Sequence, residues 1–132
     1  MPQHIRAITL LVPDYDVGIA FYVGKLGFTL VEDRVMSPAK RWVLVAPSGS
    51  TETRLLLAKA DGPAQTARIG NQAGGRVALF LTTDDFARDH AAMTAKGVEF
   101  LEAARQENYG TVAVFRDPFG NRWDLIEQRP KS

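Results

Sequence analysis

The sequence predicts an α+β fold in which a single domain, residues 1–132, is built from two βαβββ modules. Apolar and β-branched segments typical of strands alternate with helical patterns, and the order of these elements is the same in both halves of the chain. Landmark residues recur at one offset, since Arg6 and Arg76, like Gly27 and Gly97, lie 70 residues apart. A repeated order at a fixed spacing indicates an internal duplication. The modules are expected at about 4–60 and 76–128, with a linker at 61–75.

The first module is expected to contain a strand, a helix and three further strands. Residues 5–12 are mostly apolar and β-branched, which favours a buried strand that Pro13 ends. Asp14 suits a helix N-cap whose carboxylate accepts backbone N–H groups of the first turn. Gly27 suits the end of that helix, and strands follow at 28–33, 41–46 and 54–59. The apolar stripe of the helix, at spacing i, i+3, i+4 and i+7, consists of Ile19, Tyr22, Val23 and Leu26.

The second module repeats this order. A strand is expected at 77–81, and either Asp84 or Asp85 caps the next helix, which Gly97 ends. Further strands are expected at 98–101, 111–115 and 122–127. Between the last two strands lies the segment DPFG at 117–120, whose order of Asp, Pro and Gly is the signature of a type I turn and predicts a hairpin. One face of the helix carries Phe86, His90 and Met93.

The linker at 61–75 is rich in Gly and Pro and shows no periodicity. Its glycines do not follow a strand and open a helix in the way that a phosphate-binding loop requires. We therefore interpret it as a flexible crossing between the modules or as a lid.

The composition is that of an ordinary globular domain and excludes several classes of protein. Hydrophobic residues make up 45% of the chain and charged residues 23%. A formal net charge of +1 shows no basic surplus, which argues against a nucleic-acid partner. The absence of cysteine excludes disulfides, thiolate metal sites and a cysteine nucleophile. No apolar run approaches the ~18 residues of a membrane span, and no signal-peptide pattern is present, so we expect a cytoplasmic protein without a membrane partner.

Several motifs resemble those of the vicinal oxygen chelate (VOC) superfamily, which includes glyoxalase I, bleomycin- and fosfomycin-resistance proteins and extradiol dioxygenases. The matching segments are VPDY at 12–15, AFY at 20–22, LGF at 26–28, FRDPFGN at 115–121 and WDLIE at 123–127. The resemblance covers nearly the whole chain except 61–75. It implies modules whose strands form curved, open mixed sheets around a cavity, and a homodimer in which the modules pair within one chain or swap between chains.

In the enzymes of this superfamily, the resemblance implies a divalent metal held by His, Glu or Gln from the first and last strands of each module. The corresponding positions here are Ala7, residues 76–78, residues 54–56 and Asp124, and only Asp124 offers a ligand. Catalytic sites of this kind generally need three protein ligands. We therefore predict no metal and no cofactor; a divalent ion (Zn, Ni, Mn or Fe) is expected only if these positions are misaligned. His4 is expected to face away from Ala7, and His90 to lie on an outer helix.

Four residues remain candidates for a binding site. Arg76 either binds an anionic ligand through two parallel hydrogen bonds from its guanidinium or forms an ion pair within the chain, for example with Asp124. Asp124 has the same two interpretations and a third as a lone general base, its catalytic role. Trp42 and Tyr109 either line a ligand pocket or pack in the core or a dimer interface. Trp123 is expected to pack in the core, because strand alternation sends it opposite to Asp124.

The main functional hypothesis is a homodimer that binds a small organic molecule, anionic or aromatic, in a metal-free cavity. Sequestration of a toxic compound, as in bleomycin-resistance proteins, needs no metal. The alternative is an enzyme, either a metal-dependent glyoxalase-like lyase or isomerase or a ring-cleaving dioxygenase. A third possibility is a structural or regulatory partner protein. Fold resemblance alone does not decide among them.

Overall fold

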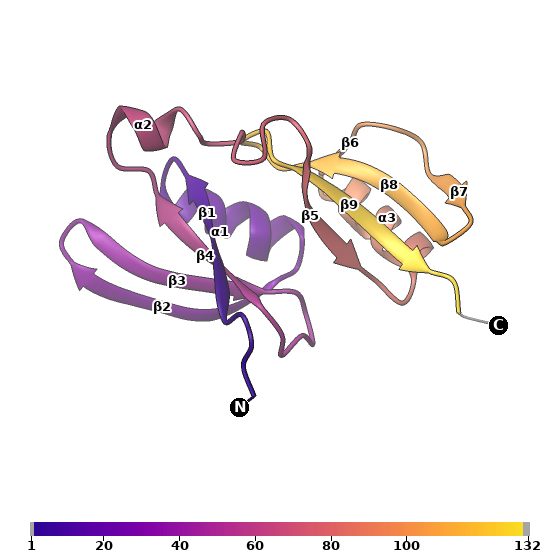
Figure 1. Ribbon diagram of the computed structural model, residues 1–132, viewed down its shortest axis with the longest axis horizontal. Helices are drawn as coiled ribbons and strands as arrows, with labels where there is room; N and C mark the ends of the chain where they lie inside the picture. Colours follow the sequence, from indigo (N-terminus) through magenta and orange to yellow (C-terminus); the bar gives the residue numbers. More distant parts are fainter. Residues whose placement is uncertain (1, 131–132) are drawn as a thin grey trace. The chain divides into compact units, whose positions relative to one another are not determined.

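The structure is a computed structural model that describes residues 2–130, and the chain divides into two compact units at residues 69 and 70 (Figure 1). Each unit contains one open mixed sheet with a helix packed on one face. The predicted linker segment contains the unit boundary, and it also includes a short helix, α2 (Gly62–Thr66), in the first unit. Pro63 lies in the first turn of α2, where its missing N–H group leaves no hydrogen bond unmade.

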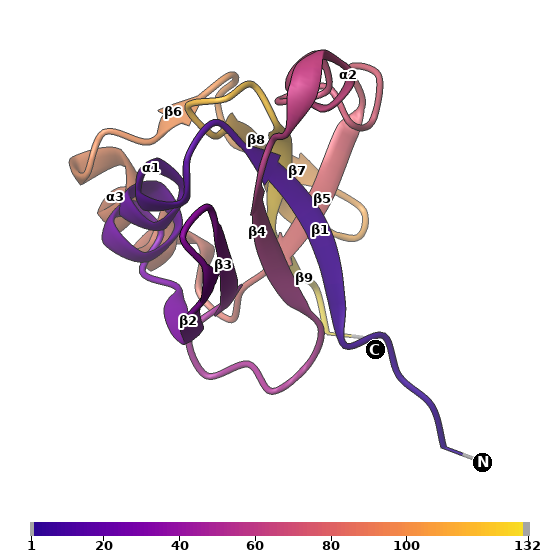
Figure 2. The same cartoon turned by 90° about the vertical axis from the view of Figure 1, so that its left-hand side faces the viewer.

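The first unit has a four-stranded sheet in the order β1-β4-β3-β2. The first and last strands of the unit, β1 and β4, are parallel, and the other neighbours are antiparallel. The helical segment between β1 and β2 packs on one face of this sheet (Figure 2). The strands are β1 (Ala7–Val12), β2 (Thr29–Ser37), β3 (Lys40–Ala46) and β4 (Arg54–Lys59).

The helical segment differs from the prediction in its geometry. It begins as α1 (Tyr15–Ile19) and continues as a π-helix, η1 (Ala20–Lys25), in which Leu26 N–H donates to the Phe21 carbonyl at 3.0 Å. The wider turn rotates the packed face, so the buried residues are Tyr15, Gly18, Phe21 and Tyr22. Of the predicted stripe only Tyr22 is buried, and its other three residues are half-buried. The prediction that the Asp14 side chain caps this helix is also wrong. Asp14 occupies the N-cap position with extended backbone, but its side chain accepts no capping hydrogen bond.

Arg41 ties three elements of the first unit together. Its Nε and Nη2 donate to the two carboxylate oxygens of Asp33 on β2 at 3.1 and 2.7 Å. Its Nη1 donates to Asp16 on α1 at 2.8 Å, and its guanidinium lies 5.3 Å from the centre of the Tyr15 ring. The hydrogen bonds from Arg41 hold the pKa of Asp33 below its usual value. The bidentate pair therefore joins β2 to β3, and the bond to Asp16 ties α1 to the same sheet.

Asp33→Asn is expected to lower the free energy of unfolding at pH 7 by about 0.5–1 kcal/mol, because it removes the charge that Arg41 binds. The pKa of Asp33 is lower in the folded chain, so its stabilisation is present above the ordinary value of 3.8 and is lost as the pH falls through the folded pKa. Urea unfolding at neutral and acidic pH measures the effect, with Glu52→Gln on the exposed β3–β4 connection as control. A loss of equal size at both pH values would contradict this role.

The second unit has a sheet in the order β5-β9-β8, with two short strands, β6 and β7, both paired with β8. As in the first unit, its first and last strands, β5 and β9, are parallel. The helix α3 (Phe86–Ala95) packs on β9 (Figure 1). The strands are β5 (Val77–Thr82), β6 (Glu99–Phe100), β7 (Arg105–Glu107), β8 (Gly110–Arg116) and β9 (Arg122–Gln128). Strand β7 was not predicted, because its three residues are polar and show no apolar alternation.

A row of rings joins α3 to the sheet of the second unit. Each ring contacts the next at centroid distances between 4.2 and 5.7 Å. Trp123 is only 3% exposed, which confirms its expected core position. In order, the rings belong to Phe86, His90, Phe100, Phe115 and Trp123.

The N-terminus of α3 is capped by Asp85, the second of the two predicted caps. Its side chain accepts a hydrogen bond from Arg88 N–H at 3.0 Å.

The predicted turn between β8 and β9 is built around the buried carboxylate of Asp117. Its Oδ1 accepts hydrogen bonds from the backbone N–H groups of Phe119, Gly120 and Asn121, and its Oδ2 accepts one from the Asn121 side chain at 2.7 Å. Gly120 N–H also donates to the Asp117 carbonyl at 3.3 Å, the bond that closes a four-residue turn. Gly70 packs on this turn, since a Cβ there would lie 1.9 Å from the Phe119 carbonyl oxygen.

Gly70→Ala is expected to lower the free energy of unfolding by more than about 1 kcal/mol, because Gly70 has a φ of +72° and lies against the turn. Gly74→Ala is the matched control, since Gly74 has a φ of +66° but nothing within 4 Å of a Cβ. Chemical unfolding measures the free energy of unfolding of both variants, and the difference between them gives the contribution of the contact between Gly70 and the turn. Equal losses would contradict the packing of Gly70 on the turn.

Candidate functional site

The candidate site lies on the face of the second sheet opposite α3, which we call the open face. Strand alternation directs Trp123 and Leu125 toward α3, so Asp124 lies on the open face. In the strand register, Asp124 is flanked by Phe80 on β5 and Val114 on β8. Phe80 is 67% exposed. A half-buried carboxylate therefore lies between two apolar neighbours.

Asp124 carries an acceptor atom without a partner. Its Oδ1 is buried and has no hydrogen-bond partner among residues 2–130. Burial raises the pKa of this carboxyl group above its ordinary value; Arg105 opposes the shift and Glu102 adds to it. A buried acceptor without a donor is costly for folding, so its presence favours a role in binding.

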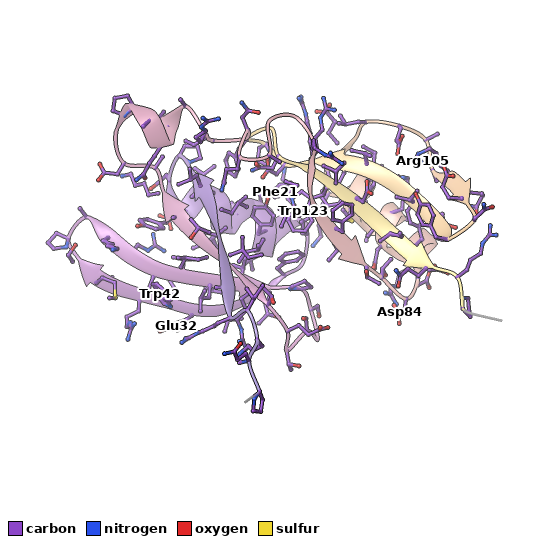
Figure 3. All side chains as sticks on the ribbon, in the orientation of Figure 1. Phe21, Glu32, Trp42, Asp84, Arg105 and Trp123 are labelled. Carbon is purple, nitrogen blue, oxygen red and sulfur yellow. The ribbon has the colours of Figure 1, made fainter. Side chains whose placement is uncertain are left out.

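Arg105 in the second unit (Figure 3) is a charged neighbour of Asp124, and two of its three side-chain nitrogens already bind carboxylates. Its Nε lies 3.1 and 3.0 Å from the two carboxylate oxygens of Glu102, and its Nη1 donates to Glu107 at 2.7 Å. Glu102 also accepts a hydrogen bond from Val114 N–H at 3.0 Å. The network fixes the β6–β7 connection against β8. The sequence analysis missed Arg105 because β7 carries no apolar pattern; the spacing of Glu102, Arg105 and Glu107 was its only signal.

The other three predicted site residues lie on segments other than β9, which carries Asp124. Tyr109 is 51% exposed in the β7–β8 turn, and its side chain lies close enough to Arg105 to help raise the pKa of that guanidinium. Arg76 is exposed in the turn before β5 and forms no ion pair with Asp124 or any other residue of the described chain. Trp42 is half-buried on β3 of the first unit. The second unit therefore holds Asp124, Tyr109 and Arg76, and the first unit holds Trp42.

The first unit has a comparable position on the face of its sheet opposite α1. Gly18 of α1 approaches Val12 and Leu57, so the neighbouring Arg54 on β4 lies on the other face. Arg54 pairs in register with Ala7, and its Nε is buried without a hydrogen-bond partner in the described chain. Its guanidinium offers a donor where Asp124 offers an acceptor.

The residues at these positions do not fit a divalent metal. The first unit presents Ala7 and Arg54 side by side, and the second presents Phe80 and Asp124. In the parallel register of β5 and β9, Phe80 rather than a residue of 76–78 lies beside Asp124, and Val77 lies beside Arg122. Residues 2–130 contain no group of three His, Asp or Glu side chains that could hold a metal ion. His4 is exposed, and the His90 ring packs between Phe86 and Phe100.

The structure has two α+β units, and each contains an open mixed sheet whose first and last strands are parallel. This is the repeated-module architecture that the sequence motifs indicate. The chain belongs to the Glyoxalase/Bleomycin resistance protein/Dioxygenase superfamily, whose family model matches residues 4–125. This confirms the resemblance and the predicted fold class.

Relatives of the chain cover nearly its full length. It is 52% identical to an uncharacterized protein of Shewanella frigidimarina over 99% of this chain and 98% of the relative. The solved structure of UcmS2 has a TM-score of 0.81 and 28% identity over 96% of this chain and 98% of its own. TnmS3, an antibiotic-binding protein from Streptomyces sp. CB03234, has a TM-score of 0.77 and 29% identity over 97% and 98%. No helix in residues 2–130 is long and apolar enough to cross a membrane.

Asp124→Asn is expected to raise the melting temperature at pH 7 while leaving it nearly unchanged near pH 3. Because the pKa of Asp124 is raised in the folded chain, stability is lost as the pH rises through that folded value, and the neutral amide escapes this loss. Thermal unfolding from pH 3 to pH 8 measures the difference, again with Glu52→Gln as control. A variant less stable than the natural chain at pH 7 would show that Asp124 has a stabilising partner.

Proposed function

We propose that this protein binds a small organic molecule through the open face of the second sheet, without a metal ion. The observation that carries the proposal is Asp124, a carboxylate with a buried, unpartnered oxygen between apolar neighbours. Ligand sites are mostly apolar and use a few polar groups to fix orientation. A ligand that donates a hydrogen bond to Asp124 and stacks on Phe80 satisfies both features.

Sequestration is the activity that fits this chemistry best. TnmS3 is described as an antibiotic-binding protein and shares the fold over nearly its whole length with 29% identity. Sequestration requires affinity and no reacting group, and the side chains at the expected ligand positions do not fit a metal. The proposed ligand is therefore an antibiotic-like organic compound with an aromatic or apolar framework.

The other candidate residues of the second unit receive proposed roles around this ligand. Tyr109 offers aromatic surface, and the exposed guanidinium of Arg76 is available for an anionic group. A binding role for Trp42, in the first unit, stays a prediction. Pairing with a second copy, as a homodimer, and a cytoplasmic location stay predictions.

A second candidate function is metal-free acid–base catalysis by Asp124. The direction of the pKa shift favours it, because a raised pKa moves this carboxyl group toward the range in which general acids and bases work. It requires turnover of a bound compound, which separates it from sequestration. Lyase or dioxygenase chemistry that depends on a metal is not supported by the side chains at the expected ligand positions.

A thermal-shift screen tests the proposal, with bleomycin and a panel of aromatic antibiotics as probes. A binder is expected to raise the melting temperature of the natural chain without added metal. Asp124→Leu is expected to weaken binding about tenfold, because it removes the acceptor. Arg76→Ala is expected to weaken the binding of anionic compounds selectively, with little change in the stability of the protein.

The same screen is run with zinc, nickel, manganese and iron(II). A metal that binds at one ion per chain and is required for ligand binding would overturn the metal-free site. A binder that Asp124→Leu does not affect would overturn the role of Asp124. Breakdown of the bound compound, followed by mass spectrometry, would favour the catalytic alternative.

A further inference from the structure

Arg54 is a charged side chain of the first unit that the proposed function leaves unexplained. It lies on β4, on the face of the sheet opposite α1, and its Nε is buried without a hydrogen-bond partner in residues 2–130. Its side chain also forms no ion pair with a described residue. Arginine stays protonated in proteins, and a buried donor of a charged group is costly without a partner. An anion is the acceptor that offsets this cost best.

Comparable arginines elsewhere in the chain show what Arg54 lacks. Among residues 2–130 the half-buried arginines are Arg41, Arg54 and Arg105. Arg41 binds the carboxylates of two aspartates and Arg105 those of two glutamates, at distances of 2.7–3.1 Å. Arg54 binds no carboxylate of the described chain. The fold thus pairs two of these three guanidinium groups with its own carboxylates and leaves the third for a ligand.

The neighbours of Arg54 on this face of the sheet are apolar. Ala7 lies beside it on β1, and its methyl group neither donates nor accepts a hydrogen bond. Leu56, two residues further along β4, lies on the same face and is half-buried. Leu56 faces Leu44 on β3, so the apolar surface continues across the sheet. A single cation among apolar side chains suits an anionic group carried by a carbon framework better than a bare inorganic ion.

We propose that Arg54 binds the carboxylate of a small organic molecule whose apolar framework lies over Leu56. A guanidinium group and a carboxylate are both planar, and two parallel N–H···O bonds join them. This site of the first sheet has the opposite polarity to that of the second, where Asp124 requires a donor. The inference does not depend on the role of Asp124, because Arg54 belongs to the other unit and its binding is measured at its own atoms.

An NMR titration tests the site at the Nε–H group of Arg54. The probe is 2-naphthoate, a carboxylate on an aromatic framework, and the control is 2-naphthamide, which has the same framework without the charge. The Nε–H signal of Arg54 is identified by its absence from the spectrum of Arg54→Met. We expect 2-naphthoate to shift this signal and 2-naphthamide to leave it in place, because only the carboxylate carries the charge that the guanidinium group binds. A signal that neither compound shifts, or that both shift equally, would overturn the proposal.

Dissociation constants of two variants separate Arg54 from positive charge in general. Arg54→Met is expected to weaken the binding of 2-naphthoate at least about tenfold, because it removes the charged donors. Arg68→Met is the matched control, since it removes the same charge from an exposed arginine of the same unit that follows α2, and its dissociation constant is expected to stay unchanged. Inorganic phosphate is expected to bind the natural chain more weakly than 2-naphthoate, because it has no framework to lie over Leu56. Equal losses in the two variants, or phosphate that binds as tightly as 2-naphthoate, would contradict the assigned site.

Thermal unfolding without ligand provides a second, independent readout. Methionine is a long, unbranched side chain without a donor, so Arg54→Met removes a buried donor that has no partner in the described chain. The melting temperature of this variant is expected to equal or exceed that of the natural chain, because an apolar group in place of an unsatisfied polar one is neutral or stabilising. A clearly lower melting temperature would show that Arg54 has a stabilising partner within the protein, and would overturn the proposal. Circular dichroism of each variant confirms folding.

Discussion

The buried carboxylate of Asp117 is the constraint on which the candidate site depends. By gathering the N–H groups of the β8–β9 turn, it fixes which residues of the two strands face each other. Phe115 therefore faces Trp123, and Val114 faces Asp124. Because side chains alternate along a strand, a slip of one residue would bring Trp123 to the open face and Asp124 into the aromatic core. One polar group thus determines both the core and the site.

Two aspartates seven positions apart on this hairpin have opposite environments. Asp117 is almost fully buried and accepts hydrogen bonds with both oxygens, as stable structure requires. Asp124 has a buried oxygen that no described residue satisfies, and its pKa is raised by that burial. The cost at Asp124 is of the kind that a protein retains where a ligand supplies the missing donor. This contrast supports a binding site at Asp124 more strongly than its position in a family motif does.

The sequence predicted those parts of the fold that local chemistry decides. The hairpin followed from the DPFG segment, and the cap of α3 from an aspartate before an apolar face. The π-helix did not follow, because an apolar stripe at i, i+3 and i+4 assumes an ordinary helix, whereas packing on the sheet buries Phe21 instead of Ile19. The neighbour of Asp124 also escaped prediction, because it depends on the parallel register of β5 and β9, which no residue type signals. Arg105 was missed because its partners are set by tertiary contacts with Glu102 and Glu107.

The first unit shows how one arginine can connect elements that lie far apart in the sequence. Arg41 on β3 binds Asp16 on α1 and Asp33 on β2, and its hydrogen bonds to Asp33 hold the pKa of that carboxyl group below its usual value. The pair lies on the side of β2 that faces α1, whereas Glu32 and Arg34 lie on the other side of the sheet. The edge of the first sheet is therefore organised from within its own unit.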